Sequence, residues 1–148
     1  MRAQGVCWRG PRIFEGPASK AVVTKWIAFY RKYRPTLTSE MLVHVRRPDG
    51  QNVDVILHAN SAADAAEQGL LFAFNPTDKA ITANVSVSLY YTGLESTATV
   101  TAGSVDELDT ASSAMGAPQV HTLRRDYSIV IEMAIPANGY EWWVIHGK

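Results

Sequence analysis

The chain has 148 residues, which suits one domain that buries about two thirds of its extended-chain surface on folding. Lysine plus arginine and aspartate plus glutamate both number 14, so the formal net charge is zero. This balance argues against nucleic-acid binding, which needs a basic surface. The single cysteine, Cys7, excludes an internal disulfide and a multi-cysteine zinc site.

The first ten residues lack the apolar core of a signal peptide, and no segment approaches the roughly 20 apolar residues of a membrane span. The sequence as written therefore predicts a soluble, cytoplasmic product that does not insert in a membrane. If the chain is part of a longer parent protein, that protein fits a secreted or periplasmic location. Nothing in the sequence indicates a cofactor.

The N-terminal region, residues 1–39, is expected to be an irregular arm followed by one amphipathic helix. The helix is predicted over 18–34, opened by Gly16-Pro17 or capped by Ser19, and closed by Pro35. Its apolar residues lie at helical spacing on one broad face: Val22, Val23, Trp26, Ile27, Tyr30 and Tyr33. We expect Val22, Trp26, Tyr30 and Phe29 to leave an exposed patch and the chain to form a homodimer or higher homo-oligomer through 18–34.

The segment 41–60 is predicted to be a hairpin around Pro48-Asp49-Gly50, a three-residue loop with a left-handed Gly50. That loop places His44 opposite Asp54. One face then collects apolar residues: Val43, Val45, Val53, Val55 and Leu57. The other face collects a polar cluster: His44, Arg46, Asp54 and His58.

Three functions are open for the polar cluster. Two imidazoles and a carboxylate form a plausible three-ligand zinc set, and His44 with Asp54 forms a plausible acid/base pair. The favoured interpretation is an ordered structural cluster without metal, because strand spacing alone is weak evidence for a ligand set.

Residues 40–148 are expected to form an antiparallel β-sandwich or open barrel, which makes the fold mainly β. Strands are predicted at 69–74, 81–91, 97–101, 119–123, 127–135 and 140–146. Residues 61–68 are a helical turn or a loop, and 102–118 a long mobile loop. Asn75-Pro76-Thr77-Asp78 and Asn138-Gly139 are turn signals, the second typical of a hairpin.

Carboxylates on these strands are the weak catalytic candidates: Asp54, Glu132 and Glu141. Glycoside hydrolysis needs two carboxyl groups about 5–9.5 Å apart, and Glu132 is expected to face Glu141 across the last hairpin. An exposed aromatic ring could instead stack on a sugar. The candidates for that role are Trp142, Trp143, Tyr90 and Tyr91.

A series of short motifs resembles one known family. In chain order they are W-x-x-F-Y-R-K-Y-R at 26–34, H-V-R-R-P-D-G at 44–50, D-V-I-L-H-A-N at 54–60, F-N-P-T-D at 74–78 and L-Y-Y-T-G-L at 89–94. With the aromatic segment 140–145, they resemble the C-terminal part of large bacterial glycoside-hydrolase-like proteins of the α-galactosidase-like group.

The resemblance implies that residues 1–34 are the end of a catalytic (β/α)₈ barrel and that 40–148 are the β-sandwich that follows it. A barrel needs about 250 residues, so its catalytic carboxylates have no counterpart here. We therefore expect a non-catalytic accessory β-sandwich associated with carbohydrate-active enzymes, structural or weakly sugar-binding. The alternatives are a small autonomous glycoside hydrolase using the hairpin-face carboxylates and a protein-interaction module using the N-terminal helix.

Overall fold

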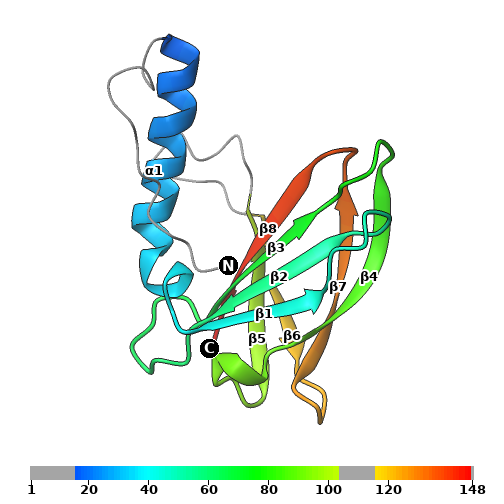
Figure 1. Ribbon diagram of the computed structural model, residues 1–148. Helices are drawn as coiled ribbons and strands as arrows, with labels where there is room; N and C mark the ends of the chain where they lie inside the picture. The colour runs from blue at the N-terminus through cyan, green and yellow to red at the C-terminus, as the bar shows by residue number, and fades with distance from the viewer. Residues whose placement is uncertain (1–15, 104–115, 148) are drawn as a thin grey trace.

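The computed structural model describes residues 16–103 and 116–147 (Figure 1). Most of the predicted arm and most of the predicted 102–118 loop lie outside these residues. The elements in chain order are α1 (Pro17–Leu37), β1 (Met41–Arg46), β2 (Asp54–Ala59), β3 (Gly69–Phe74), β4 (Ile81–Ser88), the short 3₁₀ helix η2 (Tyr90–Thr92), β5 (Thr97–Ala102), β6 (Gln119–Thr122), β7 (Ser128–Ile135) and β8 (Tyr140–His146). Residues 61–68 form a loop rather than a helical turn.

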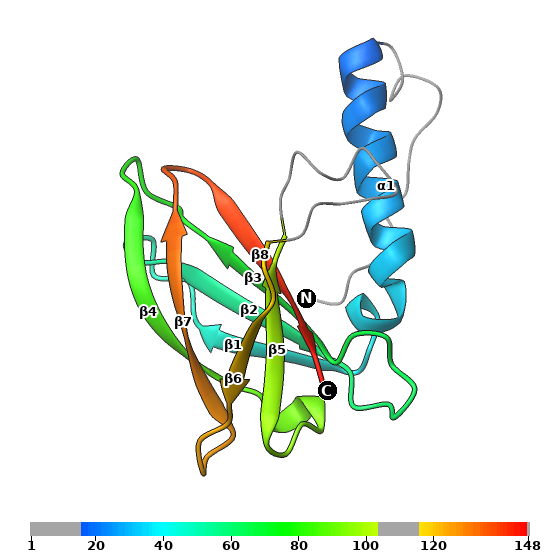
Figure 2. The same cartoon turned by 180° about the vertical axis from the view of Figure 1, so that it is seen from behind.

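The strands build two antiparallel sheets that face each other (Figures 1 and 2). The large sheet has the order β1-β2-β3-β8-β5-β6, and the small sheet pairs β4 with β7. The predicted fold class is therefore confirmed: the described chain is mainly β, with one N-terminal helix and sheets that do not close into a barrel.

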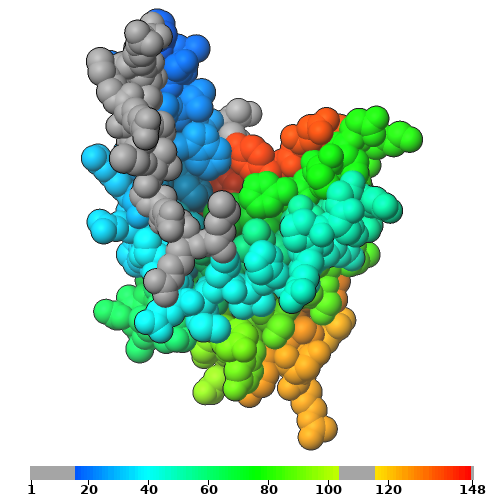
Figure 3. Space-filling view, viewed as in Figure 1, coloured from blue at the N-terminus to red at the C-terminus, as the bar shows by residue number. Residues whose placement is uncertain are grey.

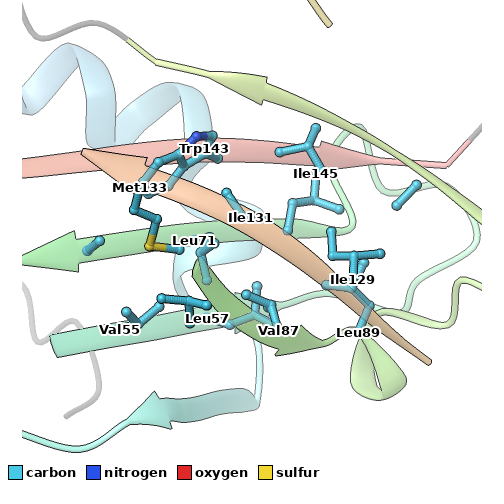
Figure 4. Close-up of a cluster of buried hydrophobic side chains, with 14 of the residues drawn as sticks. Val55, Leu57, Leu71, Val87, Leu89, Ile129, Ile131, Met133, Trp143 and Ile145 are labelled. Carbon is cyan, nitrogen blue, oxygen red and sulfur yellow. The ribbon is translucent and has the colours of Figure 1, made fainter. Parts of the chain in front are cut away.

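The main core lies between the two sheets (Figure 4). Apolar and polar residues alternate along the strands, and the apolar set forms this core because successive side chains of a strand point to opposite faces. In β4, Val85 and Val87 are buried while Ser86 and Ser88 are exposed, as the sequence pattern predicts. From β7, Ile129, Ile131 and Met133 meet the inner face of the large sheet in the same core.

A second, smaller core lies on the outer face of the large sheet, under α1. Figure 3 shows the helix, in blue, against this side of the sandwich. Phe29 and Tyr33 of the helix pack on Leu70 of β3 and on Trp142 and Val144 of β8. The helix stripe is thus covered by the sheet in its C-terminal half. Phe29 is only 5% exposed, so it does not belong to the exposed patch that we expected.

The helix begins as predicted at Gly16-Pro17, with no side-chain cap, but it does not end at Pro35. It continues to Leu37 because its last turn is tied to the sandwich. The Thr36 hydroxyl donates to the Glu67 carbonyl at 3.0 Å, and the Ser39 hydroxyl donates to the Ala59 carbonyl at 2.7 Å. Proline removes one helical hydrogen bond, and these tertiary contacts offset that loss.

The first hairpin has the predicted faces, except at Arg46, but not the predicted register. His44 pairs with Ile56 rather than Asp54, and the irregularity in the ladder lies between His44 and Arg46. The Asp49 carboxylate explains the longer loop, since its Oδ1 accepts the Gln51 and Asn52 amides at 2.8 and 2.7 Å. Those amides are thereby kept out of the ladder, while Gly50 does adopt the left-handed conformation at φ 72°.

The Asn138-Gly139 turn does not form a hairpin, because β7 pairs with β4 and β8 pairs with β3 and β5. The turn carries the chain from one sheet to the other. Buried Asn75 holds this crossing point: its Nδ2 donates to the carbonyls of Lys79, Ile135 and Pro136 at 2.7, 3.2 and 2.9 Å. The expected approach of Glu132 to Glu141 across a hairpin is therefore wrong.

Candidate functional site

The predicted polar cluster does not share one face: His44 and His58 lie on the outer face of the large sheet, whereas Arg46 pairs with the core residue Val55 beyond the irregularity in the ladder. The register shift separates His44 from Asp54, and no hydrogen bond or ion pair joins His44, Arg46, Asp54 and His58 in the described chain. Asp54 Oδ1 is buried without a hydrogen-bond partner. His58 lies against the Phe72 ring at 5.9 Å, and burial lowers its pKa, opposed by a hydrogen bond with the backbone of Leu37. The face does not form an ordered polar network.

We assign no metal site to this face. Among residues 16–103 and 116–147, no group of three or more His, Cys, Asp or Glu side chains is placed to hold a metal ion.

The two candidate tryptophans are both buried. Trp142 is 2% exposed under α1, and Trp143 is 5% exposed in the core between the sheets. Neither presents a ring face at the surface. The sugar-stacking candidates that stay at the surface are Tyr90 and Tyr91, at 62% and 45% exposure.

Tyr90 and Tyr91 form one cluster with a third ring, Tyr127, which sequence reasoning missed. Tyr90 meets Tyr91 edge to face at 5.2 Å and Tyr127 at 5.5 Å. We call these three residues the tyrosine cluster. It gathers rings from η2 and from the turn before β7, two segments about 35 residues apart in sequence.

Tyr127 reaches this position through an unusual backbone. Its φ is 61°, in the left-handed region where a bulky side chain is disfavoured. The turn enforces this conformation: Tyr127 N–H donates to the Arg124 carbonyl at 2.9 Å, and its own carbonyl accepts the Leu89 amide at 2.9 Å. Strain of this kind often accompanies functional sites. The sequence did contain one signal for this turn, the aspartate directly before Tyr127, because aspartate side chains often stabilise turns by accepting hydrogen bonds two residues on. Here Asp126 Oδ1 accepts from the Ser128 amide and hydroxyl.

A surface hollow of about 490 Å³ lies at the tyrosine cluster. Ligand sites commonly measure about 300–1,000 Å³. Its lining combines aromatic and polar groups: Met41, Ser61, Tyr90, Tyr91, Gly93, Leu94, Glu95 and Tyr127. Aromatic faces suit the C–H faces of a sugar ring, while the hydroxyl of Ser61 and the carboxylate of Glu95 suit its hydroxyl groups.

The three candidate catalytic carboxylates do not lie on one surface. Asp54 faces outward from the large sheet, between the buried residues Val53 and Val55. Glu132 and Glu141 instead line one hollow of about 680 Å³ beside β7, which we call the edge hollow. Burial raises the pKa of Glu141. Glu132 is exposed on its strand, so the two carboxyl groups have different surroundings.

The fold and the tyrosine cluster define a two-sheet β-sandwich protein with a helix on one outer face and an exposed aromatic hollow at one end. No helix in the described residues is both long and apolar enough to span a membrane. Searches against protein-family models and against curated proteins found no match. The resemblance to the α-galactosidase-like group therefore stays a prediction from the motifs.

Proposed function

We propose that this chain is a non-catalytic accessory β-sandwich, of the kind associated with carbohydrate-active enzymes, that binds carbohydrate weakly through the tyrosine cluster. The observation that carries the proposal is the set of three exposed, mutually packed tyrosine rings around a hollow with polar groups. Packing between the rings favours binding because it fixes their orientation before a ligand arrives.

Weak rather than tight binding follows from the shape of the hollow. Tyr90 and Tyr91 are both well exposed, so a bound sugar would keep much of its surface in water. Few polar side chains line the hollow, and each exposed hydrogen bond adds only about 0.5–1.5 kcal/mol. We expect dissociation constants of about 0.1–1 mM, since about 5 kcal/mol of binding free energy corresponds to that range.

Titration of neutral oligosaccharides, followed by NMR chemical shifts or calorimetry, tests the proposal. Tyr90→Ala and Tyr127→Asn should each weaken binding by about five- to tenfold, because stacking on one ring contributes about 1–1.5 kcal/mol. Asparagine tolerates the left-handed backbone at position 127, so that variant removes the ring without adding strain. Tyr30→Ala, on the helix, is the matched control. If no neutral, acidic or amino sugar binds, the proposal is wrong.

A separate part of the proposal concerns self-association through the helix. Val22 is 54% exposed and Trp26 38% exposed on α1, and Phe74 is 40% exposed on the neighbouring sheet face. Trp26 and Phe74 both lie against Tyr140, at 5.9 and 6.3 Å between ring centroids. These contacts make one continuous aromatic surface, and large exposed apolar patches commonly mark interaction sites. We propose that a second copy covers it in a homodimer.

A further inference from the structure

The small sheet does not extend over β6, whose residues are mostly exposed. β7 has β4 on one side and no strand on the other within the described chain, and it lies between β4 and β6 in both views (Figures 1 and 2). The edge hollow opens where the next strand of the small sheet would stand. It is lined by residues of β7 and Asn84 of β4 on one side, and by residues of β5, β6 and β8 with Gly116 and Ala117 on the other.

The floor of the edge hollow is the inner face of β5 and β6. Gln119 and His121 of β6 pair with Val100 and Ala98 of β5, and paired residues point to the same side of a sheet. Ala98 and Val100 belong to the core. Gln119 and His121 therefore face the same side as the core, but the small sheet does not extend over them.

β7 also lacks the features that usually protect a sheet edge. Its eight residues contain no proline and no lysine, and its pairing with β4 runs without a bulge. Natural edge strands normally carry such features because an unpaired edge can accept another strand. The one charged residue of β7 is Glu132.

The charged residues that line the edge hollow indicate which side-chain charge an added strand should have. Its described lining includes the carboxyl groups of Glu132 and Glu141 and no lysine or arginine. A second copy adding β7 to β7 about a two-fold axis would bring the two Glu132 side chains toward each other, and like charges across strands are destabilising. A strand with lysine or arginine at alternate positions would instead place positive charge beside Glu132.

We propose that the free edge of β7 and the edge hollow bind an extended cationic peptide as an added β-strand. Main-chain hydrogen bonds to β7 provide the affinity, as in other cases of strand addition. Alternate side chains of the peptide fall on two faces: one set lies over Gln119 and His121 on the inner face of β6, and the other lies beside Glu132. This surface is separate from the tyrosine cluster, so the proposal does not depend on carbohydrate binding.

The test uses the full chain and a fluorescent nine-residue peptide that alternates lysine and valine, with blocked ends. Fluorescence anisotropy at low ionic strength should show binding, and the same peptide alternating glutamate and valine should not bind. A lysine peptide N-methylated at alternate residues keeps its charge but loses main-chain donors, so it should not bind either. Amide hydrogen exchange should show new protection in β7 when the lysine peptide is added.

Two variants test the charge. Glu132→Lys should weaken binding about two- to fivefold, the size expected for an exposed ion pair, whereas Glu95→Lys, at the tyrosine cluster, should leave it unchanged. Equal binding of the lysine and glutamate peptides, or unchanged binding after N-methylation, would overturn the proposal. So would protection, in the free protein, of the β7 amides that point away from β4. Protection that rises with protein concentration would assign the edge to a second copy, and protection independent of concentration would assign it to another part of the same chain.

Discussion

Trp142 and Trp143 are consecutive residues of β8 that lie in two different cores. The Trp142 ring packs edge to face on Phe29 of α1 at 5.0 Å, and Trp143 lies between the two sheets. The last strand therefore connects the helix to the sandwich. Substitution of Trp142 should loosen the helix without disturbing the core on the other face.

The first prediction measures this connection. Trp142→Ala should lower the free energy of unfolding by about 3–5 kcal/mol, because a large buried aromatic side chain is lost and a cavity is left. Trp26→Ala is the control, since Trp26 is 38% exposed and should cost below about 1 kcal/mol in a monomer. Urea unfolding followed by circular dichroism gives both values. Equal effects of the two substitutions would show that the helix does not depend on Trp142.

The second prediction compares two polar side chains that bury oxygen or nitrogen atoms. Asn75 makes five hydrogen bonds at the crossing between the sheets, whereas Asp54 Oδ1 has no partner. Asn75→Ala should therefore cost at least about 2–3 kcal/mol, because it leaves buried carbonyls unpaired. Asp54→Ala should be neutral or stabilising. A structural polar cluster around Asp54 would instead require a loss of about 1–3 kcal/mol for Asp54→Ala, and the same unfolding measurement decides between the two.

The faces of the strands could be predicted from the sequence, but their partners could not. In β2 and β4 the apolar residues alternate locally, and this alternation requires no knowledge of the rest of the chain. A register shift of two residues keeps every side chain on its face, so the hydrophobic pattern could not distinguish His44 opposite Asp54 from His44 opposite Ile56. Likewise, the local chemistry of Asn138-Gly139 fixes a tight turn but not whether the strands on either side join one sheet.

The candidate sites differ in the same way. Tyr90 and Tyr91 could be selected because they are adjacent in the sequence, whereas Tyr127 joins them only through the main-chain contact between Leu89 and Tyr127. Glu132 and Glu141 were expected to face each other across a hairpin, and they do line one hollow, but from strands of two different sheets that the local turn signal could not assign. Residues brought together by long-range strand pairing leave no spacing signal in the sequence.

The third prediction concerns acid sensitivity. Burial lowers the pKa of His58, so the folded state favours the neutral ring and binds fewer protons than the unfolded state near pH 6. Stability should then fall as the pH decreases from about 6.5 toward the lower pKa of the folded state. His58→Gln should remove this part of the pH dependence. Free energies of unfolding from pH 8 to pH 5 in both proteins test it, and parallel curves would show that His58 does not contribute.

The fourth prediction concerns self-association. Light scattering should give a dimer at high protein concentration, and Trp26→Glu should shift it toward the monomer, because a charge would be buried in the aromatic surface. Val120→Glu is the control: Val120 is 62% exposed but lies on β6, away from α1. A monomer at every concentration, or a dimer that both substitutions weaken equally, would contradict an interface through the helix.

The last prediction concerns catalysis. A glycosidase needs a protonated acid and a second carboxylate held at a defined separation in a site that excludes water. Glu141 has part of this character, since burial raises its pKa, and Glu132 lines the same hollow. However, Glu132 is exposed on its strand and Asp54 faces away on the outer side of the large sheet, so no described carboxylate is held beside Glu141 in an enclosed cleft. We therefore expect no turnover of activated glycosides above background. Turnover that survives repurification and is lost in Glu141→Gln, while Asp54→Asn retains it and both variants stay folded, would instead identify the edge hollow as the active site of a small hydrolase.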